Sequence, residues 1–196
     1  YETAFDVELS GHLGQAPIAA TGGLIGRPGK FGKAVQVAEG TTNLFPNPSV
    51  ETNTTYLYMG SSGTGAIMER SAIAAWIGSY GLRWKLGTNP GGYAFIQQGT
   101  GAAPTTAPYT FSVWVRALGP AIGKTVVTQI VATGGSQGEE SGGDKYVALT
   151  GEWQRLVSTY TVTQADRTNL YGRLLYAGSA VTDAEIYTDA WQIEQK

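Results

Sequence analysis

The stretch at residues 42–51 reads T-N-L-F-P-N-P-S-V-E, and it separates two kinds of sequence. Pro46 and Pro48 lack a backbone donor and restrict the residues before them, so a regular central strand cannot run through this stretch. Asn-Pro pairs also commonly initiate turns. We therefore expect a fixed corner here, with a loop-rich β segment or arm at residues 1–41 before it and a compact domain at residues 42–196 after it.

The sequence after the corner predicts a run of antiparallel strands. The clearest strand is at residues 109–117, where apolar side chains alternate with Thr110, Ser112 and Arg116. The other strand candidates are residues 56–59, 66–69, 81–86, 93–98, 124–133, 146–149, 152–162, 169–177 and 185–194. Roughly eight or nine strands at spacings of about ten residues favour an all-β fold, a two-sheet antiparallel β-sandwich.

Two segments of this domain do not read as strands. Residues 71–80 follow neither the helical nor the strand period, which leaves a short helix and an irregular connection both open. Residues 134–143 read G-G-S-Q-G-E-E-S-G-G, a composition typical of an exposed, mobile loop.

The segment before the corner is rich in glycine. Its strand candidates are residues 3–10, 17–21 and 34–38, with a long turn predicted at residues 22–32. Three strands separated by such loops can hardly form an independent core. We expect an arm that packs either on its own sandwich or on a neighbouring chain, and an arm of the second kind would link protomers.

Composition excludes several classes of function. The formal net charge is −2, which gives no electrostatic basis for binding nucleic acid or an anionic membrane. The chain has no cysteine and one histidine, His12, which excludes thiolate zinc sites, cysteine nucleophiles and disulfides. No apolar run approaches the roughly 18 to 20 residues that a membrane span needs. The 15 acidic residues form no local catalytic motif, so we expect no enzymatic activity and no required cofactor.

Aromatic side chains form the most informative candidate site. The chain has 11 Tyr and 5 Trp; sugar rings stack on such residues, while sugar hydroxyls need planar polar partners. Trp114 lies on the polar face of its strand with Arg116, and this pair is the clearest glycan-binding candidate. Trp84 instead shares a face with leucines, so we expect it in the core. The further candidates are Tyr93, Gln97, Gln98, Tyr171, Arg173 and Tyr176. Filling or covering the sandwich is the alternative role for the whole set.

The corner also resembles part of a known family. Asn43-Leu44, followed by N-P-S-V-E at residues 47–51, resembles the N-L-x-x-N-P-S-F-E entrance of jelly-roll carbohydrate-binding modules of the family 4/9/22 type. Val50 stands where that pattern usually has Phe. The run G-E-W-Q-R at residues 151–155 resembles the G-x-W-x-R turn that precedes a strand in these modules. The resemblance implies a jelly-roll strand order.

Two further stretches resemble these modules as they occur in bacteriophage tail and other virion proteins. Residues 29–44 resemble the lead-in of such proteins, and residues 187–194 resemble their D-x-x-Q-L-E ending. We hypothesise a non-enzymatic virion structural protein, such as a tail or decoration protein, that contacts other virion proteins or copies of itself and recognises a cell-surface polysaccharide. The alternative is a carbohydrate-binding accessory module of a secreted polysaccharide-degrading enzyme.

The resemblance also implies a metal. Modules of this family often hold one structural calcium between the entrance Glu and an Asp of the final strand. Glu51 and Asp189 occupy the matching positions of this sequence, and hard oxygen ligands suit that ion. A structural calcium between them is therefore an expectation.

Overall fold

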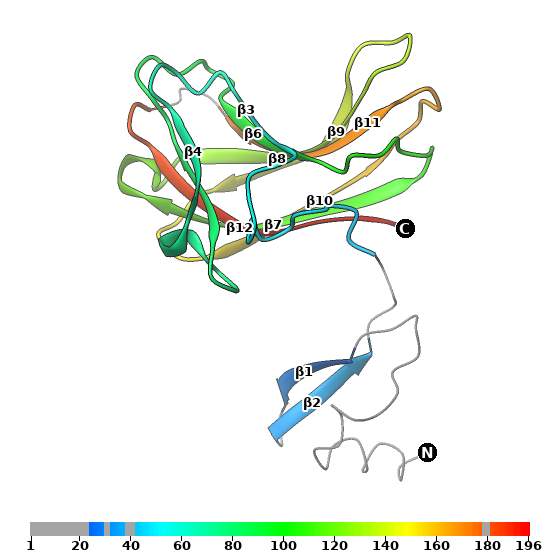
Figure 1. Ribbon diagram of the computed structural model, residues 1–196, viewed down its shortest axis with the longest axis horizontal. Helices are drawn as coiled ribbons and strands as arrows, with labels where there is room; N and C mark the ends of the chain where they lie inside the picture. Colours follow the sequence, from blue (N-terminus) through cyan, green and yellow to red (C-terminus); the bar gives the residue numbers. More distant parts are fainter. Residues whose placement is uncertain (1–23, 30–31, 38–41, 178–180) are drawn as a thin grey trace. The chain divides into compact units, whose positions relative to one another are not determined.

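The computed structural model describes residues 24–29, 32–37, 42–177 and 181–196 (Figure 1). The chain divides into two compact units, residues 1–42 and residues 43–196. The strands expected at residues 3–10 and 17–21, and the single histidine His12, lie outside the described residues.

The first unit contains an antiparallel hairpin. Strand β1 (Leu24–Gly29) pairs with β2 (Gly32–Val37) over the full length of both strands. The strand predicted at residues 34–38 is confirmed, but the long turn predicted at residues 22–32 is wrong for the residues of β1. Backbone pairing with β2 outweighs the glycine-rich composition, and Pro28 is tolerated because each strand of a two-stranded sheet is an edge.

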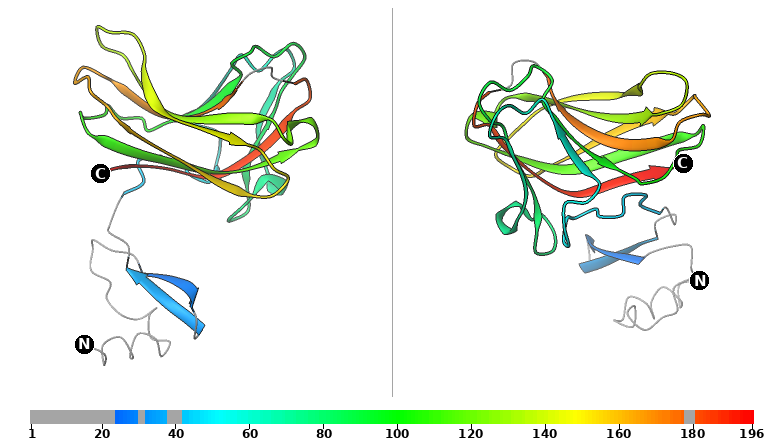
Figure 2. Two further views of the ribbon diagram at one scale, coloured as in Figure 1. Left: turned by 180° about the vertical axis from the view of Figure 1, so that it is seen from behind. Right: turned by 45° about the horizontal axis from the view of Figure 1, so that its top comes forward.

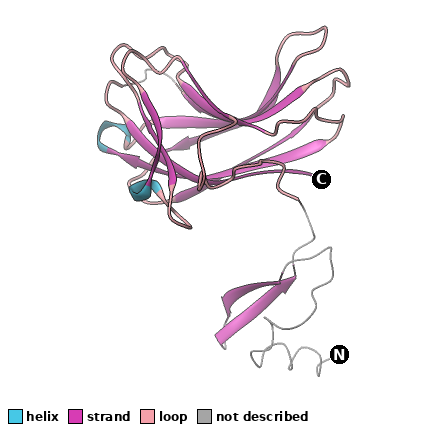
Figure 3. Cartoon of the chain, in the orientation of Figure 1, coloured by secondary structure: helices cyan, strands magenta, loops and turns pink. Residues whose placement is uncertain are grey.

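The second unit is a sandwich of two five-stranded antiparallel sheets, seen as separate layers in Figures 1 and 2. The first sheet has the order β10-β7-β12-β5-β4 and the second has the order β3-β6-β11-β8-β9. The strands are β3 (Leu57–Gly60), β4 (Ile67–Ser71), β5 (Gly81–Lys85), β6 (Phe95–Gly99), β7 (Pro108–Leu118), β8 (Thr125–Thr133), β9 (Glu140–Ala148), β10 (Gln154–Thr161), β11 (Asn169–Tyr176) and β12 (Glu185–Gln195). Two 3₁₀ turns, η2 (Ala72–Ala74) and η3 (Gly119–Ala121), are the helical elements of the described residues (Figure 3). The predicted all-β, two-sheet antiparallel sandwich is confirmed, and its arrangement agrees with a jelly roll.

Along each strand the side chains point alternately into the core and out to the surface. In β7 the odd-numbered residues from Tyr109 to Ala117 are buried, so Thr110, Trp114 and Arg116 point away from the core. Strand β11 follows the same rule, with every second residue buried. The two outer sides of the sandwich therefore carry the side chains that can meet a partner.

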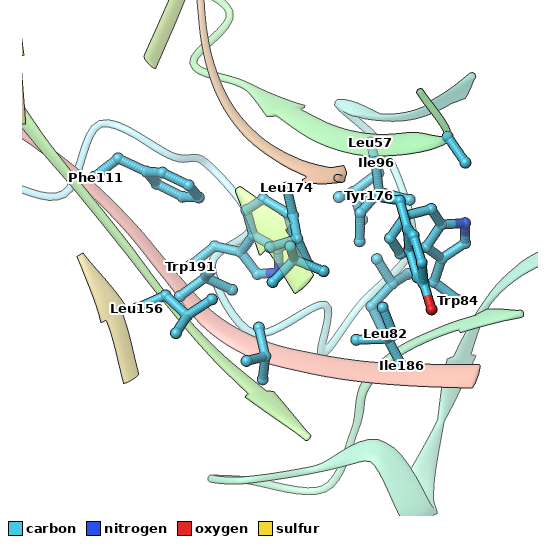
Figure 4. Packing of buried hydrophobic residues seen from close by; sticks show 14 of the residues in the cluster. Leu57, Leu82, Trp84, Ile96, Phe111, Leu156, Leu174, Tyr176, Ile186 and Trp191 are labelled. Carbon is cyan, nitrogen blue, oxygen red and sulfur yellow. The ribbon is translucent and has the colours of Figure 1, made fainter. Parts of the chain in front are cut away.

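Aromatic rings fill the space between the two sheets (Figure 4). The Phe111 and Trp191 rings lie 5.6 Å apart, and Phe45 from the entrance corner meets them edge-on at 6.0 and 6.3 Å. Trp84 is fully buried, as predicted, and packs edge-on against Tyr176 at 6.4 Å. Because a buried aromatic side chain removes about 150–250 Å² from water, these rings supply much of the hydrophobic stabilisation.

The entrance corner at residues 42–51 turns without forming a strand, as predicted, and it is tied to the last strand. Asn43 Nδ2 donates to the Trp191 carbonyl at 2.9 Å, and Asn43 Oδ1 accepts the backbone N–H of Ile193 at 3.0 Å. It thus pairs with β12 as a strand backbone does. Val50 is buried with a φ of 54°, a strained value for a β-branched residue, and Arg70 Nε holds its carbonyl at 2.7 Å.

Strand β9 corrects the prediction of a loop at residues 134–143. Residues 134–139 form a connection, but Glu140 begins β9 and is buried. The physical reason is a salt bridge to buried Arg167, a contact 27 residues along the chain that local composition does not reveal. Of the two alternatives for residues 71–80, the structure has η2 followed by an irregular loop.

Candidate functional site

The structure divides the sequence-predicted site residues between the two outer sides of the sandwich. Gln97 lies on β6, and Tyr171 and Arg173 lie on β11, on the outer side of the β3-β6-β11-β8-β9 sheet, which faces the top of Figure 1. Trp114 and Arg116 lie on β7, on the outer side of the other sheet. Because the core separates the two sides, these residues do not form one continuous site.

The remaining candidates differ sharply in exposure. Tyr93 lies in the turn before β6 and is 74% exposed. Gln98 is buried, and its amide donates to the Asn47 carbonyl at 2.7 Å. Tyr176 is buried against Trp84, and burial raises the pKa of its phenol to about 12. Gln98 and Tyr176 are therefore core residues and do not face a ligand.

The outer side of the β3-β6-β11-β8-β9 sheet is named here the β11 face. Alternate residues of β11 are buried, so Tyr171 and Arg173 between them point outward. The strand register places Tyr58 of β3, Gln97 of β6 and Gln129 of β8 in one row with Arg173. Aromatic, amide and guanidinium groups from four strands thus meet on one surface.

Two tyrosines form the aromatic part of the β11 face. Tyr58 and Tyr171 meet edge-on, with ring centroids 6.0 Å apart, and Tyr58 is 51% exposed. Tyr171 lies opposite Gly99 of β6, where an added Cβ would come within 3.1 Å of the Tyr171 ring. The absence of a side chain at Gly99 therefore gives the ring room to lie over the sheet.

Arg173 is held rigidly in the middle of this face. Its Nε donates to Gln97 Oε1 at 2.8 Å, and its two Nη atoms donate to the two oxygens of Glu139 at 2.8 and 2.9 Å. The guanidinium also lies 4.8 Å from the centroid of the Phe95 ring. The bidentate pair fixes the plane of the guanidinium and largely neutralises its charge.

The same face continues over β8 and β9 with polar and aromatic groups. Gln129 Nε2 donates to Asp144 Oδ1 at 3.0 Å. Tyr146, which lies opposite Val127, is strongly exposed. The face therefore offers further hydrogen-bonding groups and a third tyrosine ring beside the central row.

A buried ion pair lies beneath the end of this face. Glu140 accepts hydrogen bonds from Tyr160 Oη, the Thr163 backbone, Thr163 Oγ1 and Arg167 Nε, at 2.7 to 3.3 Å. Burial alone would raise the pKa of Glu140, but the bonds from Thr163, Tyr160 and Arg167 outweigh it and lower the pKa below its ordinary value. Glu140 is therefore ionised at neutral pH.

The same ion pair positions the loop at residues 134–139. Arg167 Nη1 donates to the carbonyls of Gly134 and Gln137 at 2.8 and 2.9 Å. Glu139, which pairs with Arg173, is the last residue of this loop. The buried pair thus fixes the loop that places Glu139 beside Arg173.

Three residues of the β11 face were not predicted from the sequence: Tyr58, Phe95 and Glu139. Tyr58 could have been predicted to face outward, because it alternates with the buried Leu57 in the strand candidate at residues 56–59. The position of Glu139 had no local signal, since it depends on pairing with a strand more than thirty residues away.

A different aromatic group lies on the outer side of the β10-β7-β12-β5-β4 sheet. Trp76, from the loop after η2, stacks on Trp114 with centroids 4.3 Å apart and ring planes at 21°. Trp153, just before β10, lies 5.7 Å from Trp76 at a tilt of 52°. Trp76 is 45% exposed and covers Trp114. These three side chains are named here the Trp76 platform.

Asp189 anchors the loop that carries Trp76. Its Oδ2 accepts the backbone N–H groups of Trp76 and Ile77 at 2.7 and 2.8 Å, and its Oδ1 accepts that of Ala190. Burial raises the pKa of Asp189, and these hydrogen bonds oppose the rise. The Asp189 carboxylate therefore binds three backbone N–H groups, two of them in the loop that carries Trp76.

The expected calcium ligands, Glu51 and Asp189, both accept hydrogen bonds from the loop that follows η2. Glu51 Oε1 accepts the backbone N–H groups of Ser79 and Tyr80, so it binds the same loop as Asp189. Within the described ranges, no group of three or more His, Cys, Asp or Glu side chains could hold a metal ion. Calcium binding stays a prediction of the resemblance, and chelation tests it.

The described part of the chain also lacks a helix that is long and apolar enough to cross a membrane.

Comparisons with known proteins establish the fold. Searches of protein-family models and of curated protein sequences found no match. Among solved structures, a xylan-binding domain of carbohydrate-binding module family 22 aligns with a TM-score of 0.60 at 18% identity, covering 79% of this chain and 96% of that one. The CBM22-1 xylan-binding domain from Paenibacillus barcinonensis Xyn10C aligns with a TM-score of 0.59 at 16% identity, covering 81% of this chain and 97% of that one.

A phage protein shares the same fold. The enzymatically active domain of tailspike protein 4 from bacteriophage CBA120 aligns with a TM-score of 0.59 at 9% identity, covering 79% of this chain and 21% of that one. At such identities the likeness concerns the fold alone. The predicted jelly-roll domain like that of carbohydrate-binding modules is confirmed.

Proposed function

We propose that this chain is a non-enzymatic glycan-binding domain and that the β11 face is its binding surface. The observation that carries the proposal is the row formed by Tyr58, Gln97 and Arg173, with Tyr171 beside it. Tyrosine rings offer apolar surface to the C–H face of a sugar, while amide and guanidinium groups suit its hydroxyls. Because Arg173 is fixed by Gln97 and Glu139, binding would not have to order it first.

The charges on this face favour a neutral glycan. The guanidinium of Arg173 is already paired with Glu139 in a bidentate salt bridge, and Asp144 adds a further carboxylate beside Gln129. An acidic sugar would have to displace Glu139 and would meet the Asp144 carboxylate. The hydroxyls of a neutral sugar can bond to the same groups without breaking the salt bridge.

We further propose that the domain belongs to a virion structural protein, such as a tail or decoration protein. The stretches at residues 29–44 and 187–194 and the fold shared with a phage tailspike domain support this context. The alternative, an accessory module of a secreted polysaccharide-degrading enzyme, has support in the fold shared with xylan-binding domains. The neighbouring genes distinguish the two: virion assembly genes agree with the first context, and a glycoside hydrolase in the same reading frame contradicts it.

Binding assays with matched variants test the site. Xylohexaose and β-1,4-galactotriose are the first probes, followed by an array of neutral glycans and isothermal titration of the best ligand. We expect Tyr171→Ala and Arg173→Gln to weaken binding roughly tenfold or more, with melting curves close to wild type. Trp76→Ala is the control, since it removes an exposed ring from the opposite side. Equal binding by wild type and both β11-face variants, or no glycan bound at all, would refute the site.

A further inference from the structure

The Trp76 platform is a rigid, partly exposed aromatic surface on the side opposite the β11 face. The Trp76 ring rests on Trp114 and is bordered by Trp153. Its backbone is fixed by the buried Asp189 carboxylate, which also binds the N–H of the next residue. Nearly half of the Trp76 side chain stays open to solvent although the ring is immobilised. A preorganised ring of this kind can stack a ligand at low entropic cost.

Two arginines flank the platform without carboxylate partners. Arg155 of β10 lies directly opposite Trp114 in the register, and Arg116 lies two residues along β7 on the same side. Arg155 Nη2 donates to Ser112 Oγ and to Gln192 Oε1, both at 3.1 Å, while Arg116 Nε donates to a backbone carbonyl. Within the described residues neither arginine forms a salt bridge.

Three acidic residues neighbour the platform: Asp189 lies opposite Trp114 in the strand register, Glu194 lies further along β12, and Glu152 directly precedes Trp153. The Asp189 carboxylate accepts three backbone N–H groups, and Glu194 accepts the Gln192 amide. Glu152 is exposed in the turn before Trp153 and makes no salt bridge among the described residues. The guanidinium groups of Arg155 and Arg116 therefore keep free donors beside an aromatic ring. In the described part of the chain their charges are not paired with a carboxylate, whereas that of Arg173 on the β11 face is paired with Glu139.

We propose that this surface is a second binding site and that it takes an acidic saccharide. A pyranose ring stacks on the exposed face of Trp76, and its carboxylate accepts charge-assisted hydrogen bonds from Arg155 and Arg116. The surrounding outer side carries Thr110, Thr159 and Gln192 on three neighbouring strands, together with the exposed apolar side chains of Val157, Ile73 and Ile77. That mixture of one aromatic platform with hydrogen-bonding groups suits a sugar better than the apolar core of a protein interface.

Acidic polysaccharides and their uncharged derivatives test this site. The probes are polygalacturonate, alginate and hyaluronan, each compared with its carboxyl-reduced form, in binding and tryptophan-quenching assays at low and high salt. We expect at least one acidic polymer to bind, its reduced form to lose binding, and salt to weaken it. Trp76→Ala and Arg155→Gln should each cost roughly tenfold or more in affinity. Tyr171→Ala is the control and should leave this binding unchanged.

Four outcomes would overturn the second site. No acidic polymer binds; the carboxyl-reduced form binds equally well; both Trp76→Ala and Arg155→Gln bind as wild type does; or Trp76→Ala leaves sugar binding intact but changes the mass of the protein in solution. The last outcome would assign the platform, with the exposed Ile73 and Ile77 of the same loop, to a protein contact. Because the two sites lie on opposite sides, failure here leaves the β11 face untested and intact as a proposal.

Discussion

Replacing Glu140 by alanine should destabilise the sandwich strongly, because this side chain satisfies a buried cation. The side chains of Glu140 and Arg167 are 6% and 1% exposed. The substitution would remove the acceptor for Tyr160 Oη, the Thr163 N–H, Thr163 Oγ1 and Arg167 Nε. It would leave the guanidinium buried with two backbone carbonyls as its remaining partners.

The expected cost follows from that geometry. Breaking a buried ion pair by removing one partner typically costs about 3 to 5 kcal/mol. For a protein of this size, each kcal/mol lowers the melting temperature by about 2 to 4 °C, so the fall should be about 6 to 20 °C. Glu139→Ala is the matched control, since that neighbouring carboxylate is 43% exposed and its salt bridge is worth about 1 kcal/mol or less.

Urea unfolding followed by tryptophan fluorescence measures both variants. A loss of stability in Glu140→Ala no larger than that in Glu139→Ala would refute the role of the buried ion pair. Acid provides a second check, because the folded-state pKa of Glu140 lies below its ordinary value of 4.5. Its stabilising contribution is present above pH 4.5 and is lost as the pH falls through the lowered folded pKa. The difference in the free energy of unfolding between wild type and Glu140→Ala should therefore be largest at pH 7 and should shrink below pH 4.5.

Further substitutions test other parts of the structure. Tyr176→Phe should leave stability unchanged or raise it by up to about 1 kcal/mol, because the buried hydroxyl has no partner among the described residues; a clear loss in a urea titration would reveal one. Trp84→Ala should cost about 3 to 5 kcal/mol, and Trp114→Ala should cost less because Trp114 lies outside the core; equal losses in thermal melts would contradict this. If Glu51 and Asp189 share the calcium that the resemblance implies, excess chelator should lower the melting temperature, and an unchanged melting curve would contradict that site. A truncated chain of residues 43–196 should fold cooperatively, because every described member of the core cluster lies within it, and its aggregation would contradict this. If the full chain assembles and the truncated chain is a monomer by light scattering, the first unit carries the assembly contact.

The fold could be predicted because its signals are local. Alternation along β7 and the two prolines of the entrance corner are properties of neighbouring residues, and the structure confirms both. Strand β9 could not be predicted at its start, because Glu140 is ordered by Arg167 and Thr163 from distant segments. Glycine-rich composition predicted loops at the start of β9 and in β1, but both segments are strands. Pairing with a neighbouring strand decides whether such a segment is extended.

The candidate site was predictable residue by residue but not as a surface. Trp114 was identified by residue type and by the polar side of its strand, and Arg173 by residue type alone, yet they lie on opposite sheets. Which sheet a strand joins depends on the order of pairing across the whole chain, which alternation alone does not encode. The partner of Arg173, Glu139, was hidden in a segment that composition marked as a mobile loop.

Nuclear magnetic resonance of the labelled protein with its best neutral glycan tests the central claim most directly. All five tryptophans lie away from the β11 face, two in the core and three in the Trp76 platform. A glycan on the β11 face should shift the backbone amide signals of β6 and β11, above all Gln97 and Arg173, and leave the indole signals of Trp76 and Trp153 in place. Shifts confined to those indoles, with the β6 and β11 amides unmoved, would contradict the account.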